Sequence, residues 1–182
     1  RDIAEADDAF EHCFNVLHQG FTRDRIDYAS ANFTFRDVPV VMKPFQKPWP
    51  HLWYGLRGEF GPAFAARHGM HGVSLGPDER VKALSDAFRK QWDAHSVERA
   101  KLGAAGQPPF VGVMRAMFVA DSDAEAERVA RRAHEVWFEN LAWLWKVRNA
   151  KVPISISADF DQARAAGALV VGSPDTVARV FA

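Results

Sequence analysis

Residues 52–75, LWYGLRGEFGPAFAARHGMHGVSL, decide the fold that this sequence predicts. The stretch opens on a short apolar run at 52–55, passes through a glycine-containing turn at 57–61 and ends on a second apolar run at 72–75. Between the runs, Pro62 suits the first turn of a helix and Gly69 suits its end. A strand, a helix and a strand within about 25 residues make a compact βαβ unit, and such units build a parallel sheet.

The chain before this unit changes character at Gly20. Residues 4–19 put apolar side chains on one helical face, and Gly20 follows at the position of a C-terminal cap. The apolar set is Ala6, Ala9, Phe10, Cys13, Phe14, Val16 and Leu17. Residues 21–50 alternate aromatic and β-branched residues with polar ones and contain several prolines. We expect an amphipathic helix followed by an irregular, partly extended crossing.

The chain after the unit continues to alternate helices with strands. Asp78 is placed to cap a helix that has apolar residues at spacings of three and four and ends near Gly103. Residues 103–109 predict a loop, and residues 110–120 predict the most buried strand because their apolar run is almost continuous. Arg115 interrupts that run. A buried unpaired charge is very costly, so we expect Arg115 to pair with a structural carboxylate rather than with a substrate.

The last third predicts a long helix, a strand and a final helix. Ser122 and Glu125 form a capping box at the start of a helix of about 25 residues. The second half of this helix is apolar nearly all round, with Trp137, Phe138, Leu141, Trp143, Leu144 and Trp145. Residues 150–166 carry weak signals. Residues 168–171 then predict a strand that leads into a helix with Ser173 as N-cap and Pro174 as its first residue.

Length and composition limit the fold and the partners. The 182 residues predict one domain and are too few for a closed eight-stranded α/β barrel of roughly 250 residues. Twenty-three basic and 23 acidic side chains cancel, which argues against nucleic acid and anionic membranes as partners. A single cysteine and no apolar run approaching about 18 residues predict a reducing, cytoplasmic location. Arg1 in place of a methionine predicts a trimmed chain.

Three ordered segments carry a family resemblance. The first runs from residue 33 to 69 and includes PFQKPWP at 44–50, the second is RAMFVADSDAEA at 115–126, and the third is VGSPDTV at 171–177. In this order they resemble the bacterial luciferase-like family of flavin-dependent monooxygenases. The resemblance implies a (β/α)8 barrel that uses reduced flavin mononucleotide (FMN), or in some branches the deazaflavin F420, and acts with oxygen on a small organic substrate.

Measured against this family, the chain is short. The resemblance places its beginning after about the fourth strand and its end near the seventh helix of the barrel. We therefore expect an α/β fold with parallel strands, an incomplete TIM-barrel-like (β/α) fold. The resemblance implies that residues 1–182 form a single partial luciferase-like domain, and we expect this domain to lack the opening strands and the final helices. The family's catalytic polar residues come largely from those opening strands, so none can be named in this chain.

The cofactor-binding candidates lie in and beside the turn that follows the first strand of the βαβ unit. They are Tyr54, Gly55, Arg57, Gly58 and Gly61. The resemblance implies that this turn contacts the flavin phosphate, and small residues beside a helix N-terminus suit an anion. Glu59 opposes that role, and the family often has Ser or Thr hydroxyls here. An ordinary tight turn is the alternative. Likewise Trp53 and Tyr54 either border the flavin ring or fill the core.

Other reactive side chains support no second site. His51, His68, His71 and His95 lack the spacing of a zinc site and there is only one cysteine, so we expect no metal. Cys13 lies on the apolar face of its helix, which argues against a nucleophile. Ser173 and Asp175 predict a helix cap, although the same N-terminus also suits an anion.

These observations leave more than one function open. The first is part of a flavin-dependent monooxygenase, with possible partners in a flavin reductase and a second copy of the chain. The second is a shortened, non-catalytic flavin-binding or structural protein derived from the same fold, and the third is an unrelated α/β binding module. We expect the isolated chain to be inactive, to bind flavin weakly and to self-associate. Trp143 or Trp145 should then lie in a contact between chains or against an unusual internal element.

Overall fold

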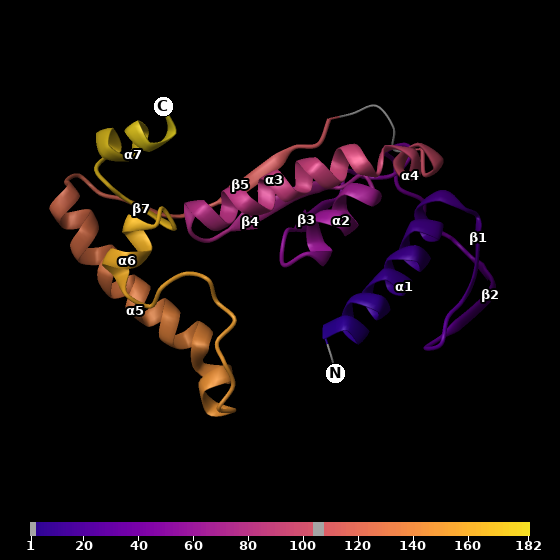
Figure 1. The fold of residues 1–182 in the computed structure, drawn as a ribbon, viewed down its shortest axis with the longest axis horizontal. Helices are drawn as coiled ribbons and strands as arrows, with labels where there is room; N and C mark the ends of the chain where they lie inside the picture. The colour runs from indigo at the N-terminus through magenta and orange to yellow at the C-terminus, as the bar shows by residue number, and fades with distance from the viewer. Residues whose placement is uncertain (1–2, 104–107) are drawn as a thin grey trace.

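The computed structural model describes residues 3–103 and 108–182, which form an arc of seven helices and seven strands (Figure 1). The helices are α1 (Ile3–Thr22), α2 (Phe60–Arg67), α3 (Asp78–Ala94), α4 (Ser96–Lys101), α5 (Asp123–Val147), α6 (Phe160–Ala165) and α7 (Pro174–Phe181). The strands are β1 (Arg25–Ala29), β2 (Thr34–Pro39), β3 (Trp53–Gly55), β4 (His71–Leu75), β5 (Val111–Met114), β6 (Ala116–Val119) and β7 (Leu169–Gly172). No helix within these ranges is long and apolar enough to cross a membrane.

The main strands run parallel and each pairs with its neighbour in chain order. β3 pairs with β4 and β4 with β5, while β6 pairs with β7. Only Arg115 separates β5 from β6, so one extended stretch pairs with β4 along its first half and with β7 along its second. This sequential order is the order of a (β/α) barrel. The described strands do not close into one.

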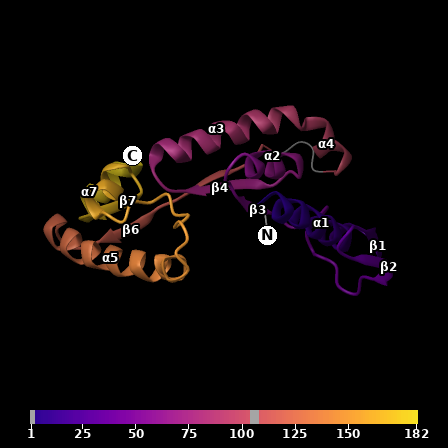
Figure 2. The same cartoon turned by 60° about the horizontal axis from the view of Figure 1, so that its bottom comes forward.

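The crossing before β3 contains an antiparallel hairpin. β1 pairs with β2, with Ala29 opposite Thr34 and Arg25 opposite Pro39. Helix α1 contacts β1, and the hydroxyl of Tyr28 lies 2.7 Å from Nδ1 of His12 on α1. The extended character expected for residues 21–50 is therefore confirmed, and it takes the form of a ribbon at one end of the arc (Figure 2).

An aromatic core holds the N-terminal part together. Its buried members are Phe14, Leu56, Phe64, Ala65, Ala66, Met70 and Phe88, from α1, the β3–α2 turn, α2, the turn after α2, and α3. Phe64 is completely buried, and its ring lies 5.3 Å from that of Phe14 and 5.1 Å from that of Tyr54. We call residues 3–103 with β5 the aromatic part.

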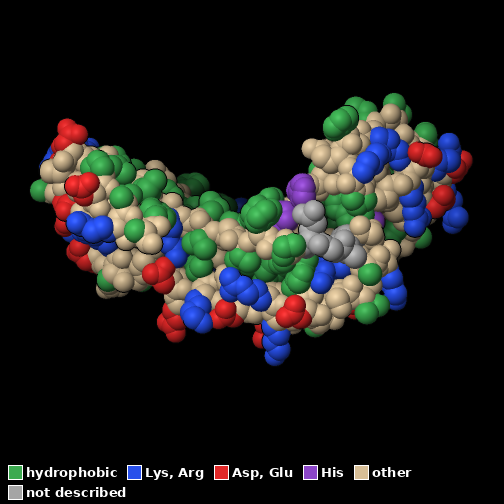
Figure 3. Space-filling view, turned by 90° about the horizontal axis from the view of Figure 1, so that it is seen from above, with side chains coloured by type: hydrophobic (Ala, Val, Ile, Leu, Met, Phe, Trp, Pro, Cys, Tyr) green, Lys and Arg blue, Asp and Glu red, His purple; other side chains and the backbone are tan. Residues whose placement is uncertain are grey.

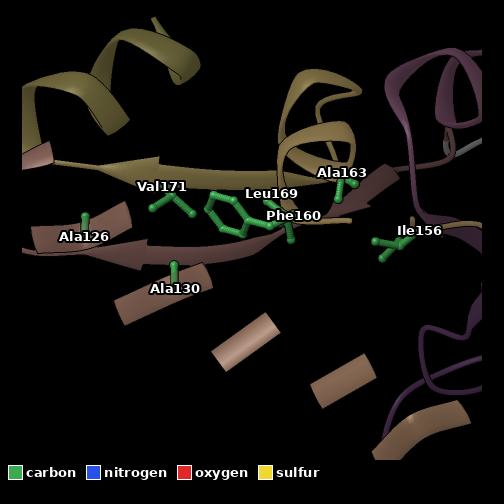
Figure 4. Close-up of a cluster of buried hydrophobic side chains, with 8 residues drawn as sticks. Ala126, Ala130, Ile156, Phe160, Ala163, Leu169 and Val171 are labelled. Atoms are coloured by element: carbon green, nitrogen blue, oxygen red, sulfur yellow. The ribbon is translucent and has the colours of Figure 1, made fainter. Parts of the chain in front are cut away.

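A core of smaller side chains holds the C-terminal part together (Figure 4). Its buried members are Ala126, Ala130, Ile156, Phe160, Ala163, Ala168, Leu169 and Val171. Alanines on α5 and α6 let both helices approach β7 closely, and the β7 residues are buried along the whole strand. We call residues 116–182 the alanine part.

The expectation that residues 110–120 form the most buried strand is wrong. β6 is exposed along its length, and Met114 and Met117 are each 57% exposed, whereas β7 is the buried strand. An apolar run predicts burial only if layers of structure cover both of its faces. In the described residues, β5 and β6 lack such cover.

Several helix boundaries also differ from those that the sequence predicted. α1 continues through Gly20 to Thr22, and α3 begins at Asp78 with Pro77 at the N-cap position. The helix expected to reach Gly103 breaks at His95 into α3 and α4. Helix α6 falls in the stretch of weak signals. Its N-cap Asp159 accepts a hydrogen bond of 2.8 Å from the Gln162 N–H, a cap that the sequence analysis did not identify.

Other local predictions are confirmed. Ser122 accepts a hydrogen bond of 3.3 Å from the Glu125 N–H at the start of α5, which is 25 residues long. Gly69 has a φ of 67° just beyond α2, as a helix-terminating glycine does. Ser173 is the N-cap of α7 and Pro174 its first residue. Part of the predicted loop, residues 104–107, lies outside the described residues.

Arg115 has the structural partner that the sequence predicted. Its guanidinium pairs with the carboxylate of Asp78 and donates a hydrogen bond of 3.0 Å to the Gly76 carbonyl. The Asp78 N–H in turn donates to the Ala166 carbonyl at 2.8 Å. Arg115 and Asp78 therefore join the end of β4, the break between β5 and β6, and the turn before β7.

Candidate functional site

The five predicted cofactor-binding residues lie together at the carboxyl end of β3. Gly55 ends the strand, Arg57 and Gly58 form the turn, and Gly61 lies in the first turn of α2. The turn is held at both sides, because the Leu56 N–H donates to the Val73 carbonyl at 2.7 Å and the Gly61 N–H donates to the Arg57 carbonyl at 3.1 Å. Ligands bind α/β sheets at this edge.

The glycines leave open space along the turn. Gly58 has a φ of 52°, and a β-carbon placed on it or on Gly55 would meet no atom within 4 Å. Gly61 is different, since its own β-carbon would lie 3.4 Å from Cε1 of Tyr54. Gly55 and Gly58 therefore keep the backbone accessible, while Gly61 allows α2 to pack closely.

Arg57 and Glu59 set the charge of the turn. Arg57 is exposed, but its guanidinium lies 3.1 Å from the Asp7 carboxylate of α1. Glu59 is the N-cap of α2, makes no capping hydrogen bond with its side chain and is exposed. The Arg57 guanidinium that could attract an anion to this turn is already paired with the Asp7 carboxylate. The Glu59 carboxylate, next to Gly58, would repel the anion.

Trp53 and Tyr54 take opposite faces of β3. The Tyr54 ring packs among Phe10 and Phe64 in the aromatic core, and burial raises the pKa of its phenol while the Arg57 guanidinium opposes the rise. Trp53 is half exposed and contacts His71 and Phe110. The core interpretation holds for Tyr54, whereas Trp53 borders the open face.

The N-terminus of α7 already holds a carboxylate. Oδ1 of Asp123, on α5, accepts a hydrogen bond of 2.6 Å from the Ser173 N–H, and Oδ2 accepts one of 3.0 Å from the Thr176 hydroxyl. These bonds lower the pKa of the Asp123 carboxyl. Asp123 thus occupies the position that the alternative interpretation assigned to an anion. Ser173 lies at the N-cap position, as the sequence predicted, but its side chain makes no capping hydrogen bond.

The histidines are closer together than their spacing suggested. Nδ1 of His51 lies 3.2 Å from Nε2 of His71, and burial lowers the pKa of His71. His68 is buried against Phe14 and Phe64, and neither ring nitrogen has a hydrogen-bond partner among the residues that the structure describes. Burial lowers its pKa to about 4. Within the described ranges, no three His, Cys, Asp or Glu side chains gather as metal ligands would. Only the fold brings these rings together, since they are separated along the chain.

A large apolar surface remains uncovered between the two ends of the arc. Figure 3 shows hydrophobic side chains along the hollow of the molecule, with histidine side chains beside them. Exposed members of this class include Trp53, Leu75, Phe110, Val113, Met114, Met117 and Val119. Cys13, which the sequence placed on the apolar face of its helix, is exposed as well, because only part of that face of α1 is covered.

Sequence comparison places this architecture in a family. The profile of the luciferase-like monooxygenases matches residues 1–182. The chain belongs to this family. Among curated proteins, the uncharacterized protein y4wF of Sinorhizobium fredii is 26% identical over 166 residues, which are 91% of this chain and 47% of y4wF.

Solved structures of luciferase-like enzymes share the fold of this family member. The monooxygenase RslO1 from Streptomyces bottropensis superimposes with a TM-score of 0.76 at 19% identity, over 99% of this chain and 50% of RslO1. The oxygenating constituent of 3,6-diketocamphane monooxygenase from Pseudomonas putida, solved with FMN, gives a TM-score of 0.59 at 16% identity, over 96% of this chain and 51% of that enzyme. The chain spans about half the length of the relatives that it matches.

Proposed function

We propose that residues 1–182 are a partial luciferase-like (β/α) barrel domain that forms one side of a flavin-dependent monooxygenase. The observation that carries this proposal is the open turn at residues 55–61, at the carboxyl end of a parallel strand in a chain of this family. When bound, reduced FMN supplies the reaction with oxygen, and the protein supplies binding, orientation and exclusion of water.

The residues present fit the phosphate end of FMN. The accessible backbone at Gly55 and Gly58 and the adjoining start of α2 offer N–H donors to an anion. Arg57 adds a cationic donor that can exchange Asp7 for a phosphate. Glu59 reduces the attraction. In this proposal Gly61 and Tyr54 support the turn from the core, and Trp53 faces the flavin side of the sheet.

The fit is incomplete in this chain alone. The sheet ends at β3 and at β7, so residues 1–182 provide only one wall of a cofactor site. We therefore expect the isolated chain to bind FMN with a dissociation constant weaker than about 1 µM, that is, with less than about 8 kcal/mol of binding free energy. F420 is the alternative cofactor in this proposal, and a flavin reductase is the expected source of reduced flavin. The substrate is a small organic molecule.

Titration with FMN tests the proposal. Arg57→Ala should weaken binding by about 1.5 to 3 kcal/mol, the range of a hydrogen bond to a charged group. Arg89→Ala is the matched control, because Arg89 is as exposed as Arg57 and also pairs with a carboxylate, that of Asp86. Equal binding by the Arg57→Ala variant would remove this turn from the cofactor site.

A shortened, non-catalytic protein is the second candidate. The carboxylates of Asp7 and Glu59 beside the only arginine of the turn favour it, because both oppose a phosphate. Complete absence of FMN binding at millimolar concentration would support this candidate over the first. Oxygen consumption with reduced FMN, at a rate above that of free reduced flavin, would support the first.

Self-association is part of the same proposal. Trp143 is 62% exposed on α5, and Val147 nearby is 60% exposed, so the end of this helix has apolar surface to cover. We propose that the chain forms a homo-oligomer in the cytoplasm with Trp143 or Trp145 in the contact. Sedimentation at low micromolar concentration should show species larger than 20 kDa. A single 20 kDa species with both indoles shielded from a soluble quencher would contradict this.

A further inference from the structure

A second pocket lies at the amino ends of β3 and β4, away from the turn at residues 55–61. It has a volume of about 400 Å³. Its lining comes from the segment before β3, from the start of β4, from α3 and from the turns that follow α2 and α4. The lining residues are Gln46, Lys47, Pro48, Trp49, Pro50, His51, Leu52, Gly69, His71, Trp92 and Gly103. The pocket is thus built from aromatic and basic side chains drawn from separate parts of the chain.

A chain of hydrogen bonds from Phe110 through His71 to His51, called the relay below, determines which ring nitrogens of the two histidines carry a proton. The backbone N–H of Phe110 lies 3.1 Å from Nδ1 of His71, and because an amide only donates, this nitrogen must be the acceptor. A neutral His71 then carries its proton on Nε2, which lies 3.2 Å from Nδ1 of His51. His51 accepts that proton's hydrogen bond and carries its own proton on Nε2. The relay leaves this N–H as a donor without a partner among the described residues.

Packing holds the relay in place. The rings of His51 and His71 stack with centres 5.3 Å apart and 14° between their planes. Trp53 and Phe110 contact the His71 ring at 4.9 and 5.0 Å. His71 is 7% exposed, and its burial, with His51 as neighbour, lowers its pKa and favours the neutral form that the relay requires.

The walls of the pocket suit a flat ring. Trp49 is buried and its indole contacts the His18 ring at 4.7 Å. Trp92 is partly buried, and the guanidinium of Arg99 lies 3.9 Å from the centre of its ring on α3. Arg99 is itself held by the carbonyls of Ala66 and Trp92. Both indoles are therefore fixed by their neighbours, and fixed indoles offer apolar area at low entropic cost.

The charge in the pocket is of one sign. Lys47 is exposed and, in the described part of the chain, pairs with no carboxylate. The described lining includes no Asp or Glu. The Lys47 ammonium group and the free imidazole N–H of His51 both donate, and the Gln46 amide adds a neutral polar group to the lining. An anion is the partner that such groups select.

We propose that this pocket binds a small aromatic carboxylate, with the ring between the indoles and the carboxylate on Lys47 and His51. The pocket is separate from the FMN turn, which lies at the opposite ends of the same strands. The inference rests on the relay and on the lining, and it stands whether or not the chain binds flavin.

Titration with benzoate and with benzamide tests the proposal, because the two probes share a ring and differ in charge. Benzoate should bind at least tenfold more tightly than benzamide. Lys47→Gln and His51→Phe should each weaken benzoate binding about tenfold, the effect of about 1.4 kcal/mol. Lys151→Gln removes an exposed lysine from the alanine part and should leave binding unchanged.

Three outcomes would overturn the proposal: equal affinity for the two probes, no effect of Lys47→Gln, or equal effects of Lys47→Gln and Lys151→Gln. Lys47 is exposed, so its variant should fold even if His51→Phe does not. FMN titration separates the two sites, since Lys47→Gln should leave FMN binding unchanged and Arg57→Ala should leave benzoate binding unchanged. If the chain binds benzoate but not FMN, the proposed function is contradicted and the inference about this pocket stands.

Discussion

The aromatic part and the alanine part both pack helices against parallel strands, but they do so with side chains of different size. In the first, α1, α2 and α3 bury large rings such as Phe14, Phe64 and Phe88. In the second, α5 and α6 bury alanines against β7, and exposed ion pairs join the helices, with Arg131 bound to Glu127 and Asp161. Rings fill space between elements that stand apart, whereas alanines require the elements to approach.

The difference predicts where each part is sensitive. A core of rings loses stability when a ring is removed, because the cavity cannot collapse fully. In the other core, half of the buried residues are alanines, which have almost no side chain to truncate, and Phe160 is its one buried ring among the cluster members. Arg115 connects the two parts, and its loss should affect both. The following changes test this contrast.

Phe64→Ala should have the largest effect. The ring is fully buried and contacts Phe14, Tyr54, Phe60 and His68, so truncation should lower the free energy of unfolding by about 3 to 5 kcal/mol. Urea unfolding measures the loss. Phe10→Ala removes a 42% exposed ring from the same cluster and should cost much less. Equal losses in the two variants would contradict an aromatic core centred on Phe64.

Acid should weaken the aromatic part through His68. Burial, together with Arg67, His18 and His95, lowers its pKa from 6.5 to about 4. The unfolded chain therefore takes up a proton before the folded one. His68 therefore leaves the free energy of unfolding undiminished above pH 6.5. As the pH drops towards 4, that free energy falls by up to about 3 kcal/mol for a pKa shift of this size.

Unfolding in urea at pH 7.5 and pH 4.5 measures the acid effect. His68→Phe should lose less stability than the parent chain between these two conditions. His134→Phe is the comparison in the alanine part, where the buried ring has its Nε2 2.8 Å from the Ser157 carbonyl. This variant should keep the acid sensitivity of the parent. An unchanged acid loss in His68→Phe would assign the effect to other groups.

Arg115→Met should have an intermediate effect. It removes the pair with Asp78 and the hydrogen bond to the Gly76 carbonyl, and should cost about 1 to 3 kcal/mol. Arg115→Lys keeps the charge and should recover part of the loss. Thermal unfolding followed by circular dichroism measures both. Full stability of Arg115→Met would mean that the two parts are joined by backbone pairing alone.

Ser122→Ala should have the smallest effect, about 1 kcal/mol, because it removes the side-chain cap of α5. Ser173→Ala is the matched variant at the start of α7. It should cost less, because the Asp123 carboxylate supplies that cap, whereas the Ser173 hydroxyl bonds to the side chains of Thr176 and Asp123 and does not cap α7. Equal losses in the two variants, measured by urea unfolding, would contradict this assignment of caps.

Local chemistry made much of the fold predictable. The Ser122 cap of α5, the Ser173–Pro174 helix start and the helix end at Gly69 each depend on a few neighbouring residues, and each was found where the sequence predicted it. The βαβ unit at 52–75 was predictable for the same reason, and the family resemblance supplied the barrel order of the strands. The candidate turn at 55–61 followed from its place after the first strand.

Distant contacts were not predictable in this way. Whether the apolar run at 110–120 is covered depends on what packs on both sides of it, and the burial of β7 depends on α5, α6 and α7 together. The Arg57–Asp7 pair and the Phe110–His71–His51 relay join residues far apart in the chain. The Asp123 cap of α7 crosses 50 positions.

The sequence by itself determined most of the elements, their order and the family, because periodicity, caps and glycines act within a few residues. Only the tertiary structure decided which apolar faces are covered, which charges neutralise each other and which histidines form a hydrogen bond with each other. Those outcomes depend on distances between segments that folding brings together. The turn at Arg57 and the pocket at His51 therefore take their character from partners that their own sequence segments do not contain.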